Sequence, residues 1–106
     1  MGRKRRLFTV PTPLGYRVFL DRDRWRTIVK HKHPAMANRE GEVRSALEEP
    51  TSIRESNKEA EVHMYYRLAA SKYVCVVVAP AAGDERFVVT AYDTANVKQG
   101  KELWRS

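Results

Sequence analysis

The apolar positions in the first third of the chain predict a helix. Trp25, Ile28 and Val29 recur at helical spacing and would form one buried face of a helix over Asp21–Lys32. Asp21 itself suits the N-cap, where an aspartate side chain can bond the free backbone N–H groups of the first turn. Pro34 restricts the residue before it, so we expect the helix to end near Lys32.

A second helix is predicted over Asn38–Glu49. Val43, Ala46 and Leu47 are its apolar stripe, and Asn38 is its candidate cap. Pro50 follows the last periodic residue and cannot continue a helix, so it is the predicted stop.

Beyond residue 50 the pattern changes to that of strands. Runs rich in β-branched and aromatic residues alternate with short turns, at Thr51–Ser56, Val62–Ala69, Tyr73–Ala79 and Arg86–Asp93. Such short connections require antiparallel pairing. Tyr16–Leu20 could add a first strand, and Lys98–Trp104 could form a short helix or an edge piece.

These elements predict an α+β fold in which two N-terminal helices pack on one face of a four-stranded antiparallel meander sheet. The 106 residues suit one domain. We assign residues 1–14 to a basic N-terminal arm and an extended lead-in, and residues 15–106 to a single α+β domain.

Alternation along the strands predicts what the face away from the helices carries. Successive strand residues point to opposite faces, and this places five side chains together: Arg54, Tyr65, Arg67, Thr90 and Tyr92. Arginine matches phosphate geometry and aromatic rings stack on single-stranded bases, so the set is typical of an RNA-binding face. Under the alternative interpretation the arginines pair with carboxylates and the tyrosines cover the edge of the core.

Composition narrows the function classes. A single cysteine, Cys75, cannot form an internal disulfide and lies in an apolar run, which is typical of a core thiol. No apolar stretch has the length of a membrane span, and no signal peptide is visible. We therefore expect a cytoplasmic protein that contacts no membrane, and we predict neither a cofactor nor a metal site, because metal-ligand spacing is missing.

The positive charge is concentrated at one end of the chain. Net charge is +7, and residues 1–33 hold ten Lys/Arg against two Asp/Glu, whereas the remaining residues nearly balance. A localised basic surface attracts polyanions, so RNA is the expected partner. A solvated face with a basic tail is the alternative.

Histidine is the natural proton carrier near neutral pH, and the chain has three: His31, His33 and His63. RNA cleavage without a metal needs a base for the 2′-OH, cations for the phosphorane and an acid for the leaving oxygen. A histidine, one or two arginines and a hydroxyl can supply this set. Motifs of serine hydrolases, zinc proteases and phosphate-binding loops are missing from the sequence.

An ordered set of short motifs also resembles a known family. The set comprises His33-Pro34, Leu47 with Pro50, Ile53-Arg54-Glu55-Ser56, Tyr65-Tyr66-Arg67, Val76-Val77-Val78, Val89-Thr90-Ala91-Tyr92 with Thr94, and Lys98 with Gly100, Leu103 and Trp104. In this order it resembles the nuclease domains of the barnase–EndoU–colicin–RelE (BECR) superfamily found in phages and mobile elements.

The resemblance implies a four-stranded antiparallel sheet behind preceding helices, and RNA cleavage by 2′-OH transesterification. It implies His33, Arg67, Thr90 and Tyr92 as catalytic residues. Arg54, Tyr65, Lys98 and His31 are the residues we expect to bind substrate, with His31 also the second option for the acid–base role.

Three function classes follow from the sequence. The leading prediction is a metal-independent endoribonuclease, toxin-like or phage-encoded, whose basic face an acidic antitoxin or inhibitor protein could cover. The alternative is a non-catalytic RNA-binding module with the same charge and aromatic pattern. A protein-interaction domain whose basic residues serve only solubility is the third.

Overall fold

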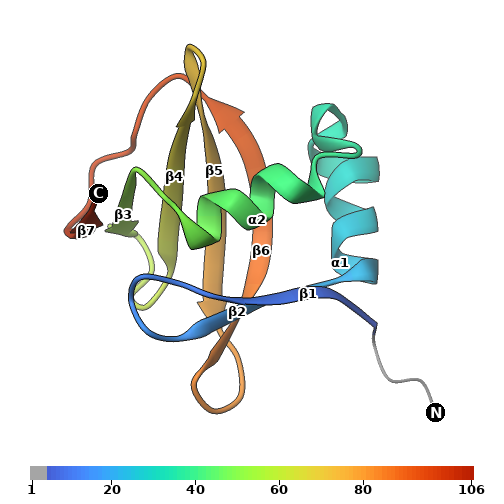
Figure 1. Ribbon diagram of the computed structural model, residues 1–106, viewed down its shortest axis with the longest axis horizontal. Helices are drawn as coiled ribbons and strands as arrows, with labels where there is room; N and C mark the ends of the chain where they lie inside the picture. Colours follow the sequence, from blue (N-terminus) through green and yellow to red (C-terminus); the bar gives the residue numbers. More distant parts are fainter. Residues whose placement is uncertain (1–4) are drawn as a thin grey trace.

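A mixed seven-stranded sheet forms the centre of the computed structural model, which describes residues 5–106 (Figure 1). The strand order is β1-β2-β6-β5-β4-β3-β7. The strands are β1 (Arg6–Pro11), β2 (Arg17–Asp21), β3 (Ser52–Glu55), β4 (His63–Ala69), β5 (Lys72–Pro80), β6 (Glu85–Thr94) and β7 (Glu102–Arg105). The helices are α1 (Arg22–Thr27), which continues as a π-helical turn (Ile28–Lys32), a 3₁₀ turn (Pro34–Met36) and α2 (Glu40–Glu48).

The predicted fold of two N-terminal helices on a four-stranded sheet is therefore wrong. Strands β3 to β6 pair antiparallel with their chain neighbours, but three further strands extend the sheet at both sides. Strand β2 pairs in parallel with β6, β1 pairs with β2, and β7 pairs with β3. The β2–β6 pair joins segments more than sixty residues apart, and local periodicity contains no signal for a pairing at such a distance.

The first hairpin uses residues that looked like a lead-in. Pro11 ends β1 at the edge of the sheet, where a missing N–H costs no ladder bond. The chain then turns through a backbone bond from Gly15 N–H to Thr12 C=O at 3.0 Å. Gly15 has a φ of 97°, which a residue without a Cβ adopts readily. Residues 1–4, the start of the predicted basic arm, lie outside the described part.

The first helix begins where the sequence predicted, whereas the N-cap of the second differs from the prediction. Asp21 occupies the N-cap of α1, but its side chain makes no capping bond. The N-cap of α2 is Arg39 rather than Asn38, which adopts a left-handed φ of 65° in the preceding turn. Among the described residues, no helix is long and apolar enough to cross a membrane.

Helix α2 covers one face of the sheet, which we call the α2 face (Figure 1). Its stripe of Val43, Ala46 and Leu47 is fully buried in the main core together with Ile53 and Tyr65. Sequence periodicity identified this stripe correctly, because an amphipathic helix must bury its apolar side against a sheet.

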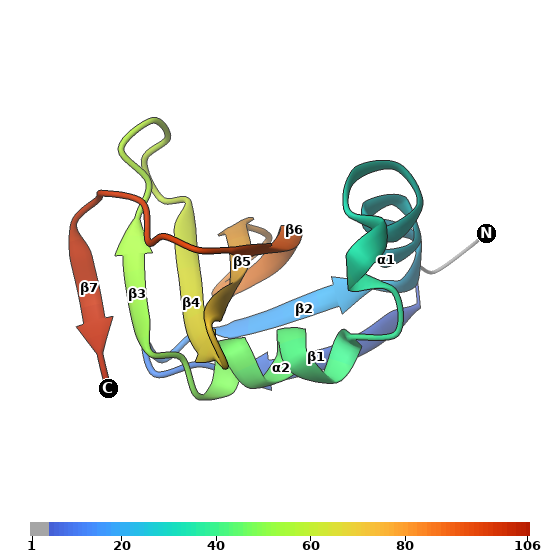
Figure 2. The ribbon, with the colours of Figure 1, turned by 90° about the horizontal axis from the view of Figure 1, so that it is seen from above.

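The other face of the sheet, the opposite face, is crossed by residues 95–101, which we call the strap (Figure 2). A second apolar cluster lies beneath the strap and consists of Met64, Tyr66 and Cys75, with Val97 of the strap packed against it. Strand β5 is apolar on both of its sides, as expected for a strand covered on both faces. The face that the sequence predicted to lie away from the helices is therefore partly covered by the strap.

Candidate functional site

The predicted RNA-binding face is divided between two sides of the sheet. Arg54 pairs with Met64, and Thr90 pairs with Val77, which places both on the opposite face, together with Tyr92. Paired residues of neighbouring strands share a face, and Tyr65 pairs with the core residue Ile53. The expectation that Tyr65 and Arg67 share a face with Thr90 is therefore wrong. The alternation on β4 was assigned one residue out of phase.

Tyr65 is a core residue. Its ring is fully buried, and its hydroxyl lies 2.9 Å from Thr12 Oγ1 and 2.6 Å from Tyr16 Oη. A buried ring cannot stack on an RNA base, so its predicted substrate-binding role has no support in the fold.

Arg67 lies on the α2 face and is engaged there. Its guanidinium donates to the backbone carbonyl of Glu49, just past the end of α2, and lies 3.8 Å from the Glu49 carboxylate. A basic side chain beside the last carbonyls of a helix satisfies them. The structure thus gives Arg67 a capping position and separates it from His33 and Thr90.

His33 and Tyr92 come together although 59 positions separate them in the chain. Their ring centroids lie 5.3 Å apart, with the planes tilted by 32°. His33 follows the π-helical turn with an extended φ of −138°, and Tyr92 lies on β6. Both side chains are partly exposed, whereas His31 in the turn is exposed. Two of the predicted catalytic residues therefore meet on the opposite face.

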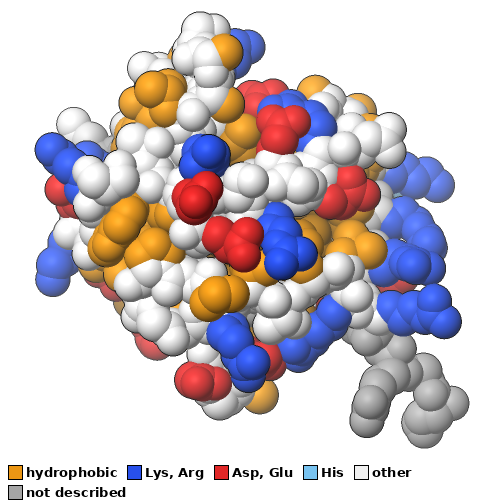
Figure 3. Space-filling view, viewed as in Figure 1, with side chains coloured by type: hydrophobic (Ala, Val, Ile, Leu, Met, Phe, Trp, Pro, Cys, Tyr) orange, Lys and Arg blue, Asp and Glu red, His pale blue; other side chains and the backbone are white. Residues whose placement is uncertain are grey.

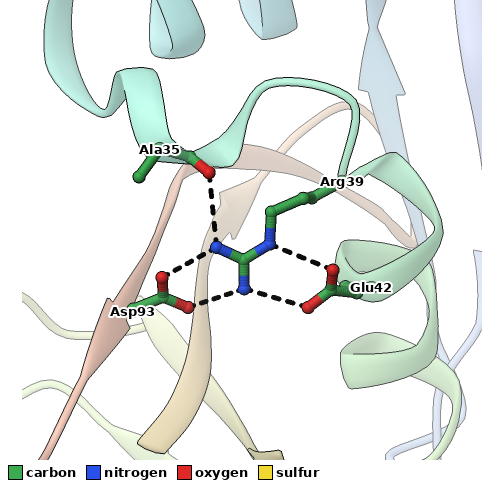
Figure 4. A network of polar contacts seen from close by, with 4 residues as sticks. All are labelled: Ala35, Arg39, Glu42 and Asp93. Carbon is green, nitrogen blue, oxygen red and sulfur yellow. Dashed lines mark hydrogen bonds and ion pairs between the residues drawn. The ribbon is translucent and has the colours of Figure 1, made fainter.

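A network centred on Arg39 holds this arrangement (Figure 4). Its guanidinium donates two hydrogen bonds to Asp93, at 2.7 and 2.8 Å, and two to Glu42, at 3.0 and 2.9 Å. A further bond reaches the backbone carbonyl of Ala35 at 3.3 Å. Asp93 follows Tyr92 on β6 and Ala35 follows the His33-Pro34 pair, so Arg39 fastens the histidine segment to the tyrosine strand. Sequence reasoning missed it, because a lone arginine in a polar turn carries no spacing signal.

Two polar atoms on the opposite face are buried and have no hydrogen-bond partner within residues 5–106: the Thr90 hydroxyl and Arg54 Nε. Unsatisfied buried polar atoms are rare in folded proteins and call for an explanation. The two residues lie on β6 and β3, three strand spacings apart, or about 14 Å at roughly 4.8 Å a spacing. They therefore cannot hold the same phosphate.

The guanidinium of Arg54 already has partners within the protein. It donates to the Gly100 carbonyl at 3.2 Å and lies 3.5 Å from the Glu102 carboxylate. Only 26% of the side chain is exposed, beside a cavity of about 300 Å³ next to the strap. The pairing with Glu102 neutralises much of its charge and places it at the margin of the site.

Tyr66, Cys75 and Tyr92 form one row across the sheet, with Cys75 between the two rings. Burial raises the pKa of the Cys75 thiol to about 11 and that of Tyr66 to about 12, and it also raises the pKa of Tyr92. All three are therefore protonated at neutral pH, and the Tyr66 hydroxyl lies 3.6 Å from the sulfur of Met64, to which it donates. The backbone N–H of Lys98 binds the Tyr66 hydroxyl at 3.1 Å, which places the exposed Lys98 on the strap above this row.

Lys and Arg side chains gather along the side of the molecule formed by α1 (Figure 3). Arg22, Arg24 and Arg26 all come from this helix, and within residues 5–106 none of them makes an ion pair. These cations lie on the helix whose π-helical continuation ends at His33, and they provide a positive surface along that helix.

A polar chain inside the molecule accounts for the third histidine. Tyr16 Oη lies 2.7 Å from His63 Nδ1, and the Arg86 guanidinium stacks 4.6 Å from the Tyr16 ring centroid. Burial, and then the charge of Arg86, lower the pKa of His63. His63 is buried, so this chain joins the first hairpin to β4 rather than facing a substrate.

Within the described part of the chain, no group of three or more His, Cys, Asp or Glu side chains is arranged to hold a metal ion. No protein-family model matches the chain, and searches among curated proteins and solved structures give no match either. The geometry of the site is therefore the basis for proposing a function.

Proposed function

We propose that this protein is a metal-independent endoribonuclease that cleaves RNA by 2′-OH transesterification. The observation that carries the proposal is the convergence of His33 and Tyr92 on one face of the sheet, where the buried hydroxyl of Thr90 has no partner within residues 5–106. The resemblance to BECR nucleases implied these three residues together with Arg67, which lies on the α2 face, and the sheet has more strands than that resemblance implied.

Each of the three residues has a chemical role that its surroundings favour. His33 is partly exposed, and an imidazole is the side chain that most often serves as a general base, so it takes the proton of the 2′-OH. The Thr90 hydroxyl has no partner within residues 5–106 but is buried, so it donates to a phosphate oxygen only once RNA binding has uncovered it. Tyr92 packs against the His33 ring, and burial raises its pKa, so its phenol keeps the proton that it gives to the leaving 5′ oxygen.

The reaction balances without a metal. The 2′ oxygen loses its proton to His33 and forms a bond to phosphorus, while the bond from phosphorus to the 5′ oxygen breaks and that oxygen gains a proton. The products are a 2′,3′-cyclic phosphate and a free 5′-OH. Lys98 on the strap and the cations of α1 supply the positive charge that the phosphorane requires.

The test is incubation of the purified protein with end-labelled RNA of mixed sequence in EDTA, followed by analysis of the fragment ends. We expect 2′,3′-cyclic phosphate ends from the native chain and their loss in His33→Gln. His31→Gln is the companion variant, because His31 is exposed on the same turn and is the second option for the acid–base role.

The other results discriminate between function classes. Cleavage that survives in His33→Gln but disappears in His31→Gln would show that His31, and not His33, is the general base. RNA that is retained at low salt and released by high salt, but never cut, would overturn the nuclease and favour a binding module. Neither cleavage nor retention would favour a protein-interaction domain.

A further inference from the structure

A cavity of about 490 Å³ lies between α1 and the paired strands β2 and β6. Phe19 and Phe87 face each other in the register of these strands, so two aromatic rings lie side by side at its base. Three residues of α1, Asp23, Arg24 and Thr27, form the wall, and Asp21 lies where β2 meets the helix. The cavity thus combines an aromatic floor with polar groups along one side.

Its position relates it to the candidate catalytic residues. Phe87 precedes Thr90 by three residues on β6, which corresponds to about 10 Å along a strand. Arg24 and His33 lie on the same α1 and π-helical unit that runs beside β6. The cavity and the His33–Tyr92 pair therefore lie between the same helical unit and the same strand, five residues or about 17 Å apart along β6, so one RNA strand of a few nucleotides can reach both.

The two cations over the aromatic rings behave differently. Arg6 lies 3.8 Å from the Phe19 ring centroid and is fixed there by two hydrogen bonds of 3.0 Å to Glu85. Arg24 lies 5.3 Å from the Phe87 centroid and makes no ion pair within residues 5–106. Arg24 can therefore move aside, and the face of Phe87 can accept a flat ligand.

We propose that this cavity binds one nucleobase of the RNA, stacked on Phe87 beneath Arg24, and that it selects bases with an exocyclic amino group. The inference rests on the proposed ribonuclease function. The carboxylates of Asp21 and Asp23 make no hydrogen bond within residues 5–106. They repel a phosphate but accept hydrogen bonds from the amino groups of cytosine, adenine or guanine. Uracil has no amino group and binds less well.

The catalytic test uses short DNA oligonucleotides that contain a single ribonucleotide, so that only one bond can be cut. The bases at successive positions on each side of that bond are varied in turn. We expect an amino-bearing base at one of these positions to raise kcat/KM about ten-fold over uracil, the effect of one good contact to a base edge. Replacing guanine by hypoxanthine, or adenine by purine, removes only the amino group and should remove most of this preference.

Variants test which residues produce the base preference. Asp21→Asn and Asp23→Asn, singly and together, should reduce the base preference, and Arg24→Gln should weaken binding of the preferred oligonucleotide. Arg44→Gln is the control, because Arg44 lies on α2, where it pairs with Glu48 on an exposed surface. Preference that survives the double aspartate variant, or equal effects of Arg44→Gln and Arg24→Gln, would overturn the proposal.

A binding readout separates this proposal from the nuclease itself. In fluorescence anisotropy with all-deoxy oligonucleotides, which cannot be cleaved, the native chain should show the same amino-base preference. A preference in binding without any RNA cleavage would overturn the nuclease and keep the base site. Cleavage of RNA with no base preference in either assay would keep the nuclease and overturn the base site.

Discussion

The guanidinium of Arg39 grips the carboxylate of Asp93 through two parallel hydrogen bonds of 2.7 and 2.8 Å, across 54 positions of the chain. This pair joins the turn that carries His33 to the strand that carries Tyr92 (Figure 4). Charge-assisted bidentate pairs are short and directional, so they fix orientation as well as contributing energy. The geometry of the candidate site therefore depends on a residue that touches neither of its rings.

Arg39→Gln should lower the free energy of unfolding by about 1–3 kcal/mol, because it leaves two carboxylates without their shared cation. Urea unfolding at neutral pH measures this change. Arg44→Gln is the control: its single pair with Glu48 lies on an exposed helix surface, and its loss should cost about 0.3–0.5 kcal/mol. Equal effects of the two variants would mean that the Arg39 network contributes no more than a surface pair.

The same pair predicts an acid-sensitive contribution to stability. Hydrogen bonding to Arg39 holds the pKa of Asp93 below its ordinary value of 3.8. A depressed carboxylate pKa adds stability that is present above that ordinary value and is lost as the pH falls through the folded-state pKa. Asp93→Asn should therefore lose stability at neutral pH and show a shallower acid limb, measured as unfolding free energy against pH. An acid limb as steep as that of the native chain would show that Asp93 contributes little to it.

His63 predicts a second pH dependence of stability, at higher pH. Its folded-state pKa lies below the ordinary value of 6.5, because burial and Arg86 disfavour the charged ring more than Glu55 and Glu61 favour it. The unfolded chain therefore binds a proton first, and stability should fall as the pH drops below about 6.5. His63→Gln should reduce this slope in unfolding experiments between about pH 7.5 and 5.5. His31→Gln, which changes an exposed histidine, should leave the slope as it is.

Tyr65→Phe should lower the stability of the protein without changing its cleavage of RNA. The change removes a hydroxyl that lies within hydrogen-bond distance of Thr12 and Tyr16 in a buried position, and should lower stability by about 1–2 kcal/mol. Since the ring faces the core, RNA cleavage by the folded variant should proceed at the native kcat. A drop in kcat with unchanged stability would restore Tyr65 to the site.

Gly100→Ala and Gly41→Ala should act in opposite directions. An added Cβ at Gly100 would run into the backbone carbonyl of Glu55, so the strap must shift and stability should fall by about 1–3 kcal/mol. At Gly41, within α2, a Cβ meets nothing within 4 Å, and alanine should add about 0.5–1 kcal/mol. Thermal unfolding of the two variants tests both, and a neutral Gly100→Ala would mean that the strap can adjust without cost.

The sequence by itself determined the local elements of this protein. The stripe of Val43, Ala46 and Leu47 and the β-branched run of β5 bury their side chains wherever they are placed, because apolar periodicity depends only on neighbouring residues. Its cationic first third likewise follows from composition alone. The ordered motifs predicted that His33 and Tyr92 belong to the same site. The spacing of residues along the chain did not predict that their rings lie side by side.

Tertiary structure decided which side chains share a face. The phase of β4 could not be settled by alternation, because both of its faces are apolar in this fold: Tyr65 belongs to the core under α2, and Tyr66 to the cluster under the strap. The parallel pairing of β2 with β6 and the return of the chain to form β7 depend on contacts between distant segments. Such contacts form only when the whole sheet assembles, so no local pattern encodes the cavity beside Phe87 or the place of Arg39.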